Sequence, residues 1–223
     1  MNTTTHPDAV GRYVVHGQSH FFAIKRSEIE RCGLAAARVI ATFELLPGRF
    51  VLTISLMPEI AQFGPFESGV QLLGLLGTNA DLSPYEATRV EALVRLFDVA
   101  AICGIDKSVL DGLAMIGKNA AEIFKGRIVW ARPDAYALVA AMPGVIARRC
   151  VELGPVLGLE CAAGEGMHID GREWDISDAG GTIRLSSRAY RIQPVTDLDT
   201  GVKGHVVGLP CSCGNRDPLV VLD

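Results

Sequence analysis

Three cysteines and one histidine in the last third of the chain have the spacing that is most specific for chemistry. Cys161 is followed by His168, and after a long interval the sequence reads Cys211-Ser212-Cys213. Two ligands near one turn and two near another are typical of a tetrahedral Cys3His zinc site, in which no position is open to a substrate. These residues therefore predict a structural Zn²⁺ site at Cys161, His168, Cys211 and Cys213.

The alternative interpretation is that these thiols belong to an apolar core, because free cysteines are among the most buried residue types. The remaining cysteines, Cys32, Cys103 and Cys150, lie in apolar sequence and are predicted to be core residues. Cys150 or His205 could still replace one of the four ligands, and the sequence leaves this open.

The composition predicts a globular protein and excludes several classes of partner. The chain has 223 residues, of which 49% are apolar, and a net charge of −4. This length can bury a sizeable core, and the apolar fraction excludes disorder as the main state. No basic stripe or polybasic cluster is present, so we expect neither a nucleic-acid partner nor an anionic membrane partner.

No segment of the sequence predicts a membrane span or a secretory signal. The longest apolar stretch, Val39–Met57, is interrupted by Glu44, Pro47 and Arg49, whereas a spanning helix needs about 20 apolar residues. The N-terminus is polar and has no basic region leading into an apolar run. We therefore expect a cytoplasmic protein whose cysteines are reduced thiols or metal ligands.

The elements that must position the cysteines change in character near residue 150. Before it, apolar strands alternate with helices, as in Val99–Cys103 and then Ser108–Met115. This alternation predicts a parallel sheet flanked by helices. After it, short alternating segments are separated by Gly-rich turns, which is typical of antiparallel strands. We therefore predict an α/β fold with a loose tail over 1–12, an α/β core over 13–150 and a β-rich, zinc-containing sub-domain over 151–223.

Several individual elements follow from local signals. Ser83-Pro84-Tyr85-Glu86 predicts a helix start, with Ser at the N-cap and Pro at N1. Before it, we predict a short helix over Ser27–Ala36 capped by Ser27, β-type runs at Arg38–Phe43 and Arg49–Leu56, and a buried helix over Ile60–Leu76 that ends at Gly77.

The β-rich tail resembles a known family. It is similar to phenylacetate–CoA ligases and F390-synthetase-like proteins, a branch of the acyl-adenylating (AMP-binding) superfamily. Four motifs carry the resemblance. An E-C pair is Glu160-Cys161, and a G-x-H-x strand is Gly166–Ile169. Part of a Y-R-T-G-D motif is Thr200-Gly201, and a P-C-x-C-G turn is Pro210–Gly214. Several members bind a structural zinc through the matching Cys, His, Cys and Cys. Weaker similarity extends over most of residues 15–221, which is about half of a full ligase.

The residues that adenylating members use for ATP differ here. The family's S-S-G-T-T-G-x-P phosphate loop corresponds to Val15–Phe21, which has one glycine and one hydroxyl to hold phosphates. Of the Y-G-x-T/S-E motif, only Glu152 can stand in for the magnesium-binding Glu, after a one-residue shift. The ribose-binding Asp falls at Val202, and the C-terminal lid domain with its catalytic lysine has no counterpart before Asp223. We therefore expect a truncated, ligase-like protein that uses neither ATP nor Mg²⁺.

Three functions remain open. The first is a non-catalytic relic in secondary or aromatic-acid metabolism, which binds an aryl or acyl carboxylate or thioester or acts as a partner subunit. Loss of covering segments would expose apolar surface, so a homodimer or a complex with another protein is expected. The second is a repurposed enzyme that acts on an aryl or acyl thioester without ATP. The third is an AMP-forming carboxylate–CoA ligase completed by another polypeptide.

Polar residues near the family's acyl pocket are the candidates for a repurposed enzyme. They are Glu44, Glu59, Arg132 and Asp134. A carboxylate in an apolar pocket can become a general base, although a solvated surface position is the more common one for any single Glu. His16 and His20 lie in the region of the phosphate loop and are expected to be exposed. Arg148-Arg149 is expected either to meet a thioester's phosphates or to cap a helix end.

Overall fold

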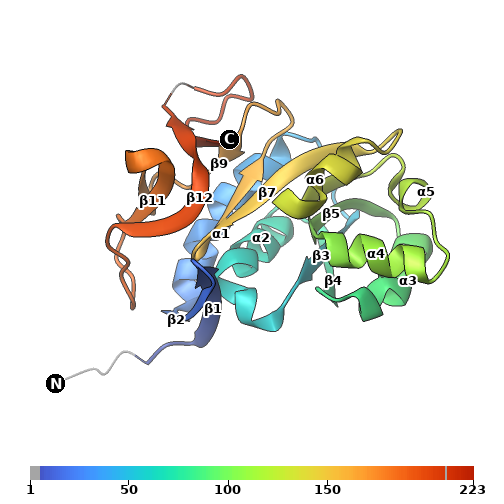
Figure 1. Ribbon diagram of the computed structural model, residues 1–223, viewed down its shortest axis with the longest axis horizontal. Coiled ribbons are helices and arrows are strands. Elements are labelled where there is room, and N and C mark those ends of the chain that lie inside the picture. Colours follow the sequence, from blue (N-terminus) through green and yellow to red (C-terminus); the bar gives the residue numbers. More distant parts are fainter. Residues whose placement is uncertain (1–5, 209) are drawn as a thin grey trace.

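An eleven-stranded sheet organises the residues that the computed structural model describes, 6–208 and 210–223 (Figure 1). Its strand order is β10-β11-β12-β13-β9-β8-β7-β6-β5-β3-β4. A hairpin of β1 (Ala9–Val15) and β2 (Gln18–Ile24) forms a separate two-stranded sheet. Cys161, His168, Cys211 and Cys213 lie on the large sheet or on loops that join its strands, whereas His16 and His20 lie on the hairpin.

One half of the sheet is parallel and is covered by helices on both faces. Its strands are β3 (Phe50–Ser55), β4 (Leu76–Asp81), β5 (Val99–Ile105), β6 (Ile128–Ala131) and β7 (Ile146–Leu153). The helices α1 (Arg26–Ala41) and α2 (Ile60–Leu72) pack on one face. The helices α3 (Ala87–Leu96), α4 (Lys107–Met115), α5 (Ala120–Phe124) and α6 (Pro133–Ala140) pack on the other. The predicted parallel sheet flanked by helices is confirmed.

The other half of the sheet is antiparallel. It contains β8 (Val156–Glu160), β9 (Met167–His168), β10 (Trp174–Ser177), β11 (Thr182–Ser187), β12 (Leu198–Val207) and β13 (Leu219–Leu222). Strand β7 joins the halves, because it pairs in parallel with β6 and antiparallel with β8. The change of sequence character near residue 150 thus marks a change of strand direction within one continuous sheet. The division into two sub-domains stays a prediction.

Helices α1 and α2 pack against each other at two glycines. A Cβ atom on Gly69 would lie 2.8 Å from the backbone nitrogen of Ala37, and a Cβ atom on Gly33 would lie 2.6 Å from the Ser68 Oγ. Such distances are shorter than van der Waals contact, so only glycine allows the two backbones to come this close. The pair forms one rigid layer over the sheet.

The helix start predicted at Ser83 is confirmed. The Ser83 Oγ accepts a hydrogen bond from the backbone nitrogen of Tyr85 at 3.2 Å, and a short 3₁₀ turn over Pro84–Glu86 leads into α3. A side-chain oxygen that accepts from an unpaired N–H of the first turn is the usual action of an N-cap serine.

Three predictions around α1 and α2 are wrong. Arg38 to Ala41 continue α1 and do not form a β-type run, and α1 begins at Arg26 after Lys25, so Ser27 is not its N-cap. Val39 and Ile40 are buried on the same helix face as Ala36, and this packing outweighs their β propensity. Helix α2 ends at Leu72, because the backbone of Gly74 takes a positive φ of 69° and the chain then enters β4.

The predicted loose tail is also wrong in part. Residues 9–12 belong to β1, which pairs with β2 from Ala9 opposite Ile24 to Val15 opposite Gln18. The sequence signal is weak, because apolar and polar residues do not alternate regularly in β1 and β2. Residues 1–5 of this tail lie outside the described residues. Among the helices of the described residues, none has the length and apolar character needed to cross a membrane.

Candidate functional site

The structure brings Cys161, His168, Cys211 and Cys213 together in one cluster. Their ligand atoms all lie within 4.8 Å of one another. The Cys161 and Cys211 sulfurs are 3.6 Å apart, and the Cys213 sulfur lies 3.4 Å from His168 Nε2. A tetrahedral Zn²⁺ with bonds of about 2.3 Å to sulfur and about 2.0 Å to nitrogen would separate such ligands by about 3.8 Å and about 3.5 Å. The geometry of the cluster fits this ion.

Two tight turns and a short strand hold the four ligands. Cys161 follows β8 directly, and the Gly164 nitrogen donates to its carbonyl at 3.1 Å. In the same way the Gly214 nitrogen donates to the Cys211 carbonyl at 2.9 Å, and Gly214 takes a positive φ of 84°. His168 lies in β9, between β8 and β13 in the sheet. The four residues therefore come from the end of β8, from β9 and from the loop between β12 and β13.

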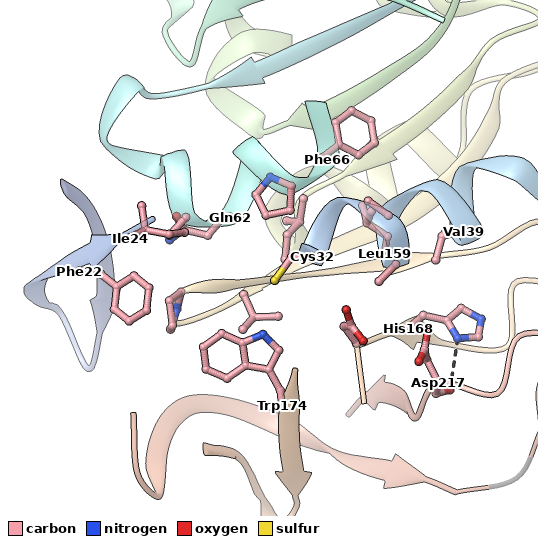
Figure 2. A pocket seen from close by; sticks show the side chains of 18 of the residues that line it. Phe22, Ile24, Cys32, Val39, Gln62, Phe66, Leu159, His168, Trp174 and Asp217 are labelled. Carbon is pink, nitrogen blue, oxygen red and sulfur yellow. Dashed lines mark hydrogen bonds between the residues drawn. The ribbon is translucent and has the colours of Figure 1, made fainter. Parts of the chain in front are cut away.

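Residues outside the cluster fix the orientation of His168. Its Nδ1 lies 3.4 Å from the Asp217 carbonyl oxygen, so Nδ1 carries the proton and Nε2 faces the cluster (Figure 2). Arg38 of α1 donates to the Asp217 carboxylate at 2.6 Å and lies 3.7 Å from Asp170. A hydrogen bond on the second ring nitrogen is the common way to orient a metal-binding histidine.

Arg148 holds the Cys161 turn against the sheet. Its guanidinium donates to the carbonyls of Cys161 at 2.9 Å and Ala162 at 2.7 Å. The Ala162 nitrogen in turn donates to the Thr42 Oγ1 at 3.0 Å. Arg149 is paired with Glu160, so neither arginine caps a helix end. The sequence analysis named Arg148 but not this role, and it missed Thr42, since both residues are distant from the cysteines in sequence and belong to no motif.

Burial shifts the acid–base behaviour of the cluster. It raises the pKa of the Cys161, Cys211 and Cys213 thiols and lowers the pKa of the His168 imidazole. Desolvation disfavours the charged form of each group, so the four ligands are neutral in the absence of a cation. Three neutral thiols around one imidazole, two of them buried and that of Cys213 half-buried, are the donor set that Zn²⁺ prefers, and the cation would supply the charge that stabilises thiolates.

The two alternative ligands lie elsewhere in the described part of the chain. Cys150 is buried on β7 opposite Leu159, and His205 lies on β12 opposite Val221. Neither belongs to the Cys/His cluster. Cys103 and Cys150 are core residues, as predicted, whereas Cys32 is half-buried.

A second group of charged residues lies at the carboxyl ends of the parallel strands, where α/β sheets bind ligands. Arg132 follows β6 and is bound by two glutamates. It donates to both carboxylate oxygens of Glu59, at 2.8 and 3.4 Å, and it also pairs with Glu152 of β7. Its Nε donates to the Gly104 carbonyl at 3.2 Å, and its guanidinium lies 5.0 Å from the Phe63 ring centroid. The arginine is saturated by the protein itself.

Two carboxylates share one arginine in this cluster, so their negative charges exceed its positive charge by one. Burial raises the pKa of Glu152, and the Arg132 charge only partly offsets this. Burial alone would lower the pKa of Arg132, but the charges of Glu152 and Glu59 outweigh it and raise this pKa. Burial thus favours the protonated form of Glu152, whereas the Arg132 charge favours its carboxylate.

Two of the predicted pocket residues lie away from this cluster. Asp134 is exposed in the first turn of α6, and its carboxylate accepts a hydrogen bond from the backbone nitrogen of Lys107 at 3.1 Å. Glu44 is exposed after α1, with a positive φ of 53°. Of the four residues, the structure brings only Glu59 and Arg132 together, and it adds Glu152.

The region expected to correspond to a phosphate loop is a two-residue turn. His16 and Gly17 have φ values of 50° and 73°, which gives the type I′ turn common in tight hairpins. His16 Nε2 lies 3.7 Å from the Asp199 carboxylate on β12. His20 stacks on Tyr13 with 5.2 Å between ring centroids. His16 is exposed, as expected, while His20 is partly covered.

A pocket of about 340 Å³ opens beside Glu59. It lies at the carboxyl ends of β3 and β4, and its lining includes Ser55, Phe63, Glu67 and Asp81. Burial raises the pKa of Glu67. Glu59 belongs both to the lining of this pocket and to the Arg132 cluster.

No protein-family model matches the sequence, and no curated protein matches it by sequence. Solved structures do share its architecture. An open conformation of 2-hydroxyisobutyryl-CoA ligase in complex with 2-HIB-AMP and CoA is similar with a TM-score of 0.71 and 14% identity, over 97% of this chain and 56% of that chain. The fold is that of acyl-CoA ligases and adenylation domains.

Two further solved structures share this fold with the chain. The postadenylation state of the same ligase, with R3-HIB-AMP, has a TM-score of 0.69 and 16% identity, over 95% of this chain and 50% of that chain. The Klebsiella oxytoca NpsA N-terminal subdomain, in complex with 3-hydroxyanthranilyl-AMSN, has a TM-score of 0.55 and 12% identity, over 95% of this chain and 59% of that chain. The chain therefore spans about half the length of these ligase-like structures.

Proposed function

We propose that this protein has the fold of an acyl-CoA ligase but does not adenylate carboxylic acids, and that it binds an acyl or aryl compound as a carboxylate or thioester, or serves as a partner subunit. The phenylacetate–CoA ligase branch is the one we assign, on the Cys/His cluster in its tail. The cluster holds a structural Zn²⁺ in this proposal, with Cys161, His168, Cys211 and Cys213 as ligands.

The two-residue turn at His16-Gly17 carries the first part of the proposal. A nucleotide's phosphates need a longer loop that turns several backbone N–H groups toward one point. In this hairpin, Val15 pairs directly with Gln18, so strand pairing continues to the turn and no such loop is left. This geometry supports a protein without ATP or Mg²⁺ chemistry.

The contacts of Arg132 also support a protein that does not adenylate carboxylic acids. At the carboxyl ends of β6 and β7, its guanidinium is held by Glu59, Glu152 and the Gly104 carbonyl. A substrate carboxylate would have to displace a glutamate from a nearly buried arginine, which carries a large desolvation cost. The neighbouring 340 Å³ pocket is the place we assign to an acyl or aryl group.

Pyrophosphate exchange tests the negative part of the proposal. The protein is incubated with ATP, labelled pyrophosphate and a panel of aromatic and short aliphatic acids, with an active acyl-CoA ligase as the positive control. We expect no exchange above the level without acid, and no heat of ATP binding in calorimetry. Acid-dependent exchange by this protein alone would overturn the proposal.

A screen for ligands tests the positive part. Carboxylic acids and their CoA thioesters are added to the protein during thermal unfolding, because a compound that binds the native state raises its melting temperature. A Phe63→Ala variant, which alters the 340 Å³ pocket, should lose the shift while an Ala41→Leu variant on exposed α1 surface keeps it. A panel without any hit would leave the partner-subunit form of the proposal, which predicts a homodimer or a stable complex with another protein.

A repurposed enzyme is the second candidate function. The raised pKa of Glu152, next to Arg132, is the observation that favours it, because a carboxylate of this kind can serve as a general acid or base. Turnover of an aryl or acyl thioester without ATP, abolished by Glu152→Gln, would establish this alternative. The ligase completed by another polypeptide has no observation in its favour.

A further inference from the structure

Strand β4 forms an open edge of the large sheet. The strand order ends at β4, which pairs with β3 on one side and has no strand on its other side among the described residues (Figure 1). Its pairing with β3 is regular, from Phe50 opposite Leu76 to Ser55 opposite Asp81. A regular strand with a free edge is a template on which another strand can pair.

The register with β3 determines which backbone groups face the open side. The Leu76 nitrogen donates to the Arg49 carbonyl at 2.9 Å, so the backbone groups of Leu76 point toward β3. In a parallel pair this direction alternates from one residue to the next along the strand. Gly77, Asn79 and Asp81 therefore present their N–H and C=O groups to the open side.

The two edges of the sheet differ in how they are protected against pairing. Natural edge strands are usually blunted by short length, charge, proline or a bulge. Strand β10, at the opposite edge, has four residues and includes exposed Asp175, which lies 3.6 Å from Arg188. Strand β4 has six residues without proline or lysine, its register with β3 does not shift, and its one charged residue, Asp81, is the last. The edge at β4 is thus the one suited to pairing.

A two-fold axis at Asn79 makes this edge complementary to itself. A second, antiparallel copy then pairs Asn79 with Asn79 and Gly77 with Asp81, and each pair exchanges two hydrogen bonds. Asp81 falls opposite Gly77, which has no side chain, so no like charges meet. Leu76, which is 46% exposed, falls opposite Leu82 of the second copy and adds an apolar contact at each end.

The other symmetric registers are less favourable. An axis at Asp81 would place two carboxylates directly opposite each other, which destabilises a strand pair. An axis at Gly77 would leave Asp81 beyond the paired segment and its backbone groups unused. Charge and hydrogen bonding therefore select Asn79 as the centre.

We propose that two copies of this chain associate through β4, antiparallel about Asn79, so that their sheets join into one. The second copy is the occupant that this edge fits, because all three outward-facing residues find partners in an identical strand. The contact requires neither the ligand nor the metal proposed above.

This pairing would bring two pockets together across the axis. The pocket of about 340 Å³ borders Asn79 and Asp81, and another of about 300 Å³ borders Gly77 and Asn79. Both also touch Glu67 of α2, so they lie on the same face of the sheet. The first pocket of one copy would lie beside the second pocket of the other, whose lining includes Gln71. A role of this shared space in ligand binding rests on the proposed function, whereas the pairing itself does not.

Sedimentation of the full chain at several concentrations measures the association. We expect a reversible dimer, and we expect Asn79→Lys to weaken it about tenfold or more, because two ammonium groups would meet at the axis. Ser177→Lys is the matched control at an exposed position of β10, and it should leave the dimer unchanged. Asn79 is exposed and its N–H points away from β3, so circular dichroism should show an intact fold in the variant.

Cysteine crosslinking tests the register. The Cα atoms of a hydrogen-bonded antiparallel pair lie about 5.5 Å apart, which is within the range that a disulfide spans. We expect Asn79→Cys to give a disulfide-linked dimer on mild oxidation. The wild type, which contains the native cysteines, and Ser177→Cys should remain unlinked under the same conditions.

Three results would overturn the proposal. The first is a monomer at every concentration, even if another protein or a further chain segment then covers the edge. The second is a dimer that Asn79→Lys does not weaken. The third is a dimer in which Asn79→Cys forms no crosslink, because the axis would then lie elsewhere.

Discussion

Cys211 is the residue at which the proposed metal centre is most directly tested. Four ligand atoms within 4.8 Å predict about one Zn²⁺ per chain in protein purified without chelator, measured by elemental analysis. Cys211→Ser should lose most of this metal and lower the urea midpoint, because a structural zinc contributes folding free energy. Cys32→Ser, at a half-buried thiol outside the cluster, should keep the metal. Protein free of metal, or an unchanged midpoint in Cys211→Ser, would contradict the assignment.

Glu152 makes the stability of the protein depend on pH. Burial raises its pKa in the folded state above the ordinary value of 4.5, so the folded state binds this proton more tightly than the unfolded state does. Its contribution therefore favours folding at low pH and is lost as the pH rises from about 4.5 through the folded pKa.

Glu152→Gln removes this titration. We expect the variant to become more stable relative to the wild type as the pH rises from 4.5 to neutral. The measurement is the unfolding free energy of both proteins in urea at several pH values. Glu165→Gln is the control, because the pKa of this exposed carboxylate is lowered by hydrogen bonds from Ser212 and its trend runs in the opposite direction. A pH-independent difference for Glu152→Gln would refute the assignment.

The clustering of Cys161, His168, Cys211 and Cys213 was predictable from the sequence, whereas the contacts that join Glu59, Arg132 and Glu152 were not, although each residue was named there. Cys and His have few structural roles that demand their spacing, so Cys161, His168 and the Cys211–Cys213 pair are informative by type alone. Glu59, Arg132 and Glu152 are common residues that meet only because three separate strand ends converge. Asp134 carries a carboxylate, as a pocket residue would, but it lies at the start of α6 and is exposed.

At the scale of elements, the contact between α1 and α2 depends on Gly69. Gly69→Ala would place a methyl group 2.8 Å from the Ala37 nitrogen, and the helices would have to separate. We expect a loss of about 1–3 kcal/mol in unfolding free energy, measured by urea denaturation. Gly77→Ala on β4 is the matched control, since a Cβ there meets nothing within 4 Å. Equal effects of the two substitutions would contradict this account of the packing.

Elements with strong local signals were predictable, and those defined by distant contacts were not. Ser83-Pro84 fixes a helix start through its own chemistry, whichever surface the helix later covers. Val39 and Ile40 have β propensity, yet they extend α1 because the core beneath the helix buries them. Strands β8 and β13 have no strong local signal, and each pairs with a neighbouring strand on both sides.

At the scale of the whole molecule, the continuous sheet predicts one cooperative unfolding transition. Trp130 lies in the parallel half on β6, and Trp174 lies in the antiparallel half on β10. The Trp130 indole also donates to the Glu160 carbonyl at 2.8 Å, next to Cys161 of the Cys/His cluster. We expect the single-tryptophan variants Trp130→Phe and Trp174→Phe to give coincident urea curves when each is followed by its remaining fluorescence and by circular dichroism.

Chelation extends this prediction. Removal of the metal with EDTA should lower the midpoint reported by Trp130 as much as that reported by Trp174, because strands β6 to β9 are joined in one sheet. Two separated transitions, with only the Trp174 signal sensitive to EDTA, would show instead that the halves unfold independently.

The position of β13 has a consequence for synthesis on the ribosome. This strand is the last in the described chain, yet it lies inside the sheet, between β12 and β9. Until residues 219–222 have left the exit tunnel, β9 and β12 have no shared neighbour and their edges stay open. The parallel half can be completed before β13 is made, whereas the antiparallel half and its cysteine turn close only after residues 219–222 have emerged. Nascent chains stalled in this interval present unpaired strand edges, which are the features that molecular chaperones have to shield.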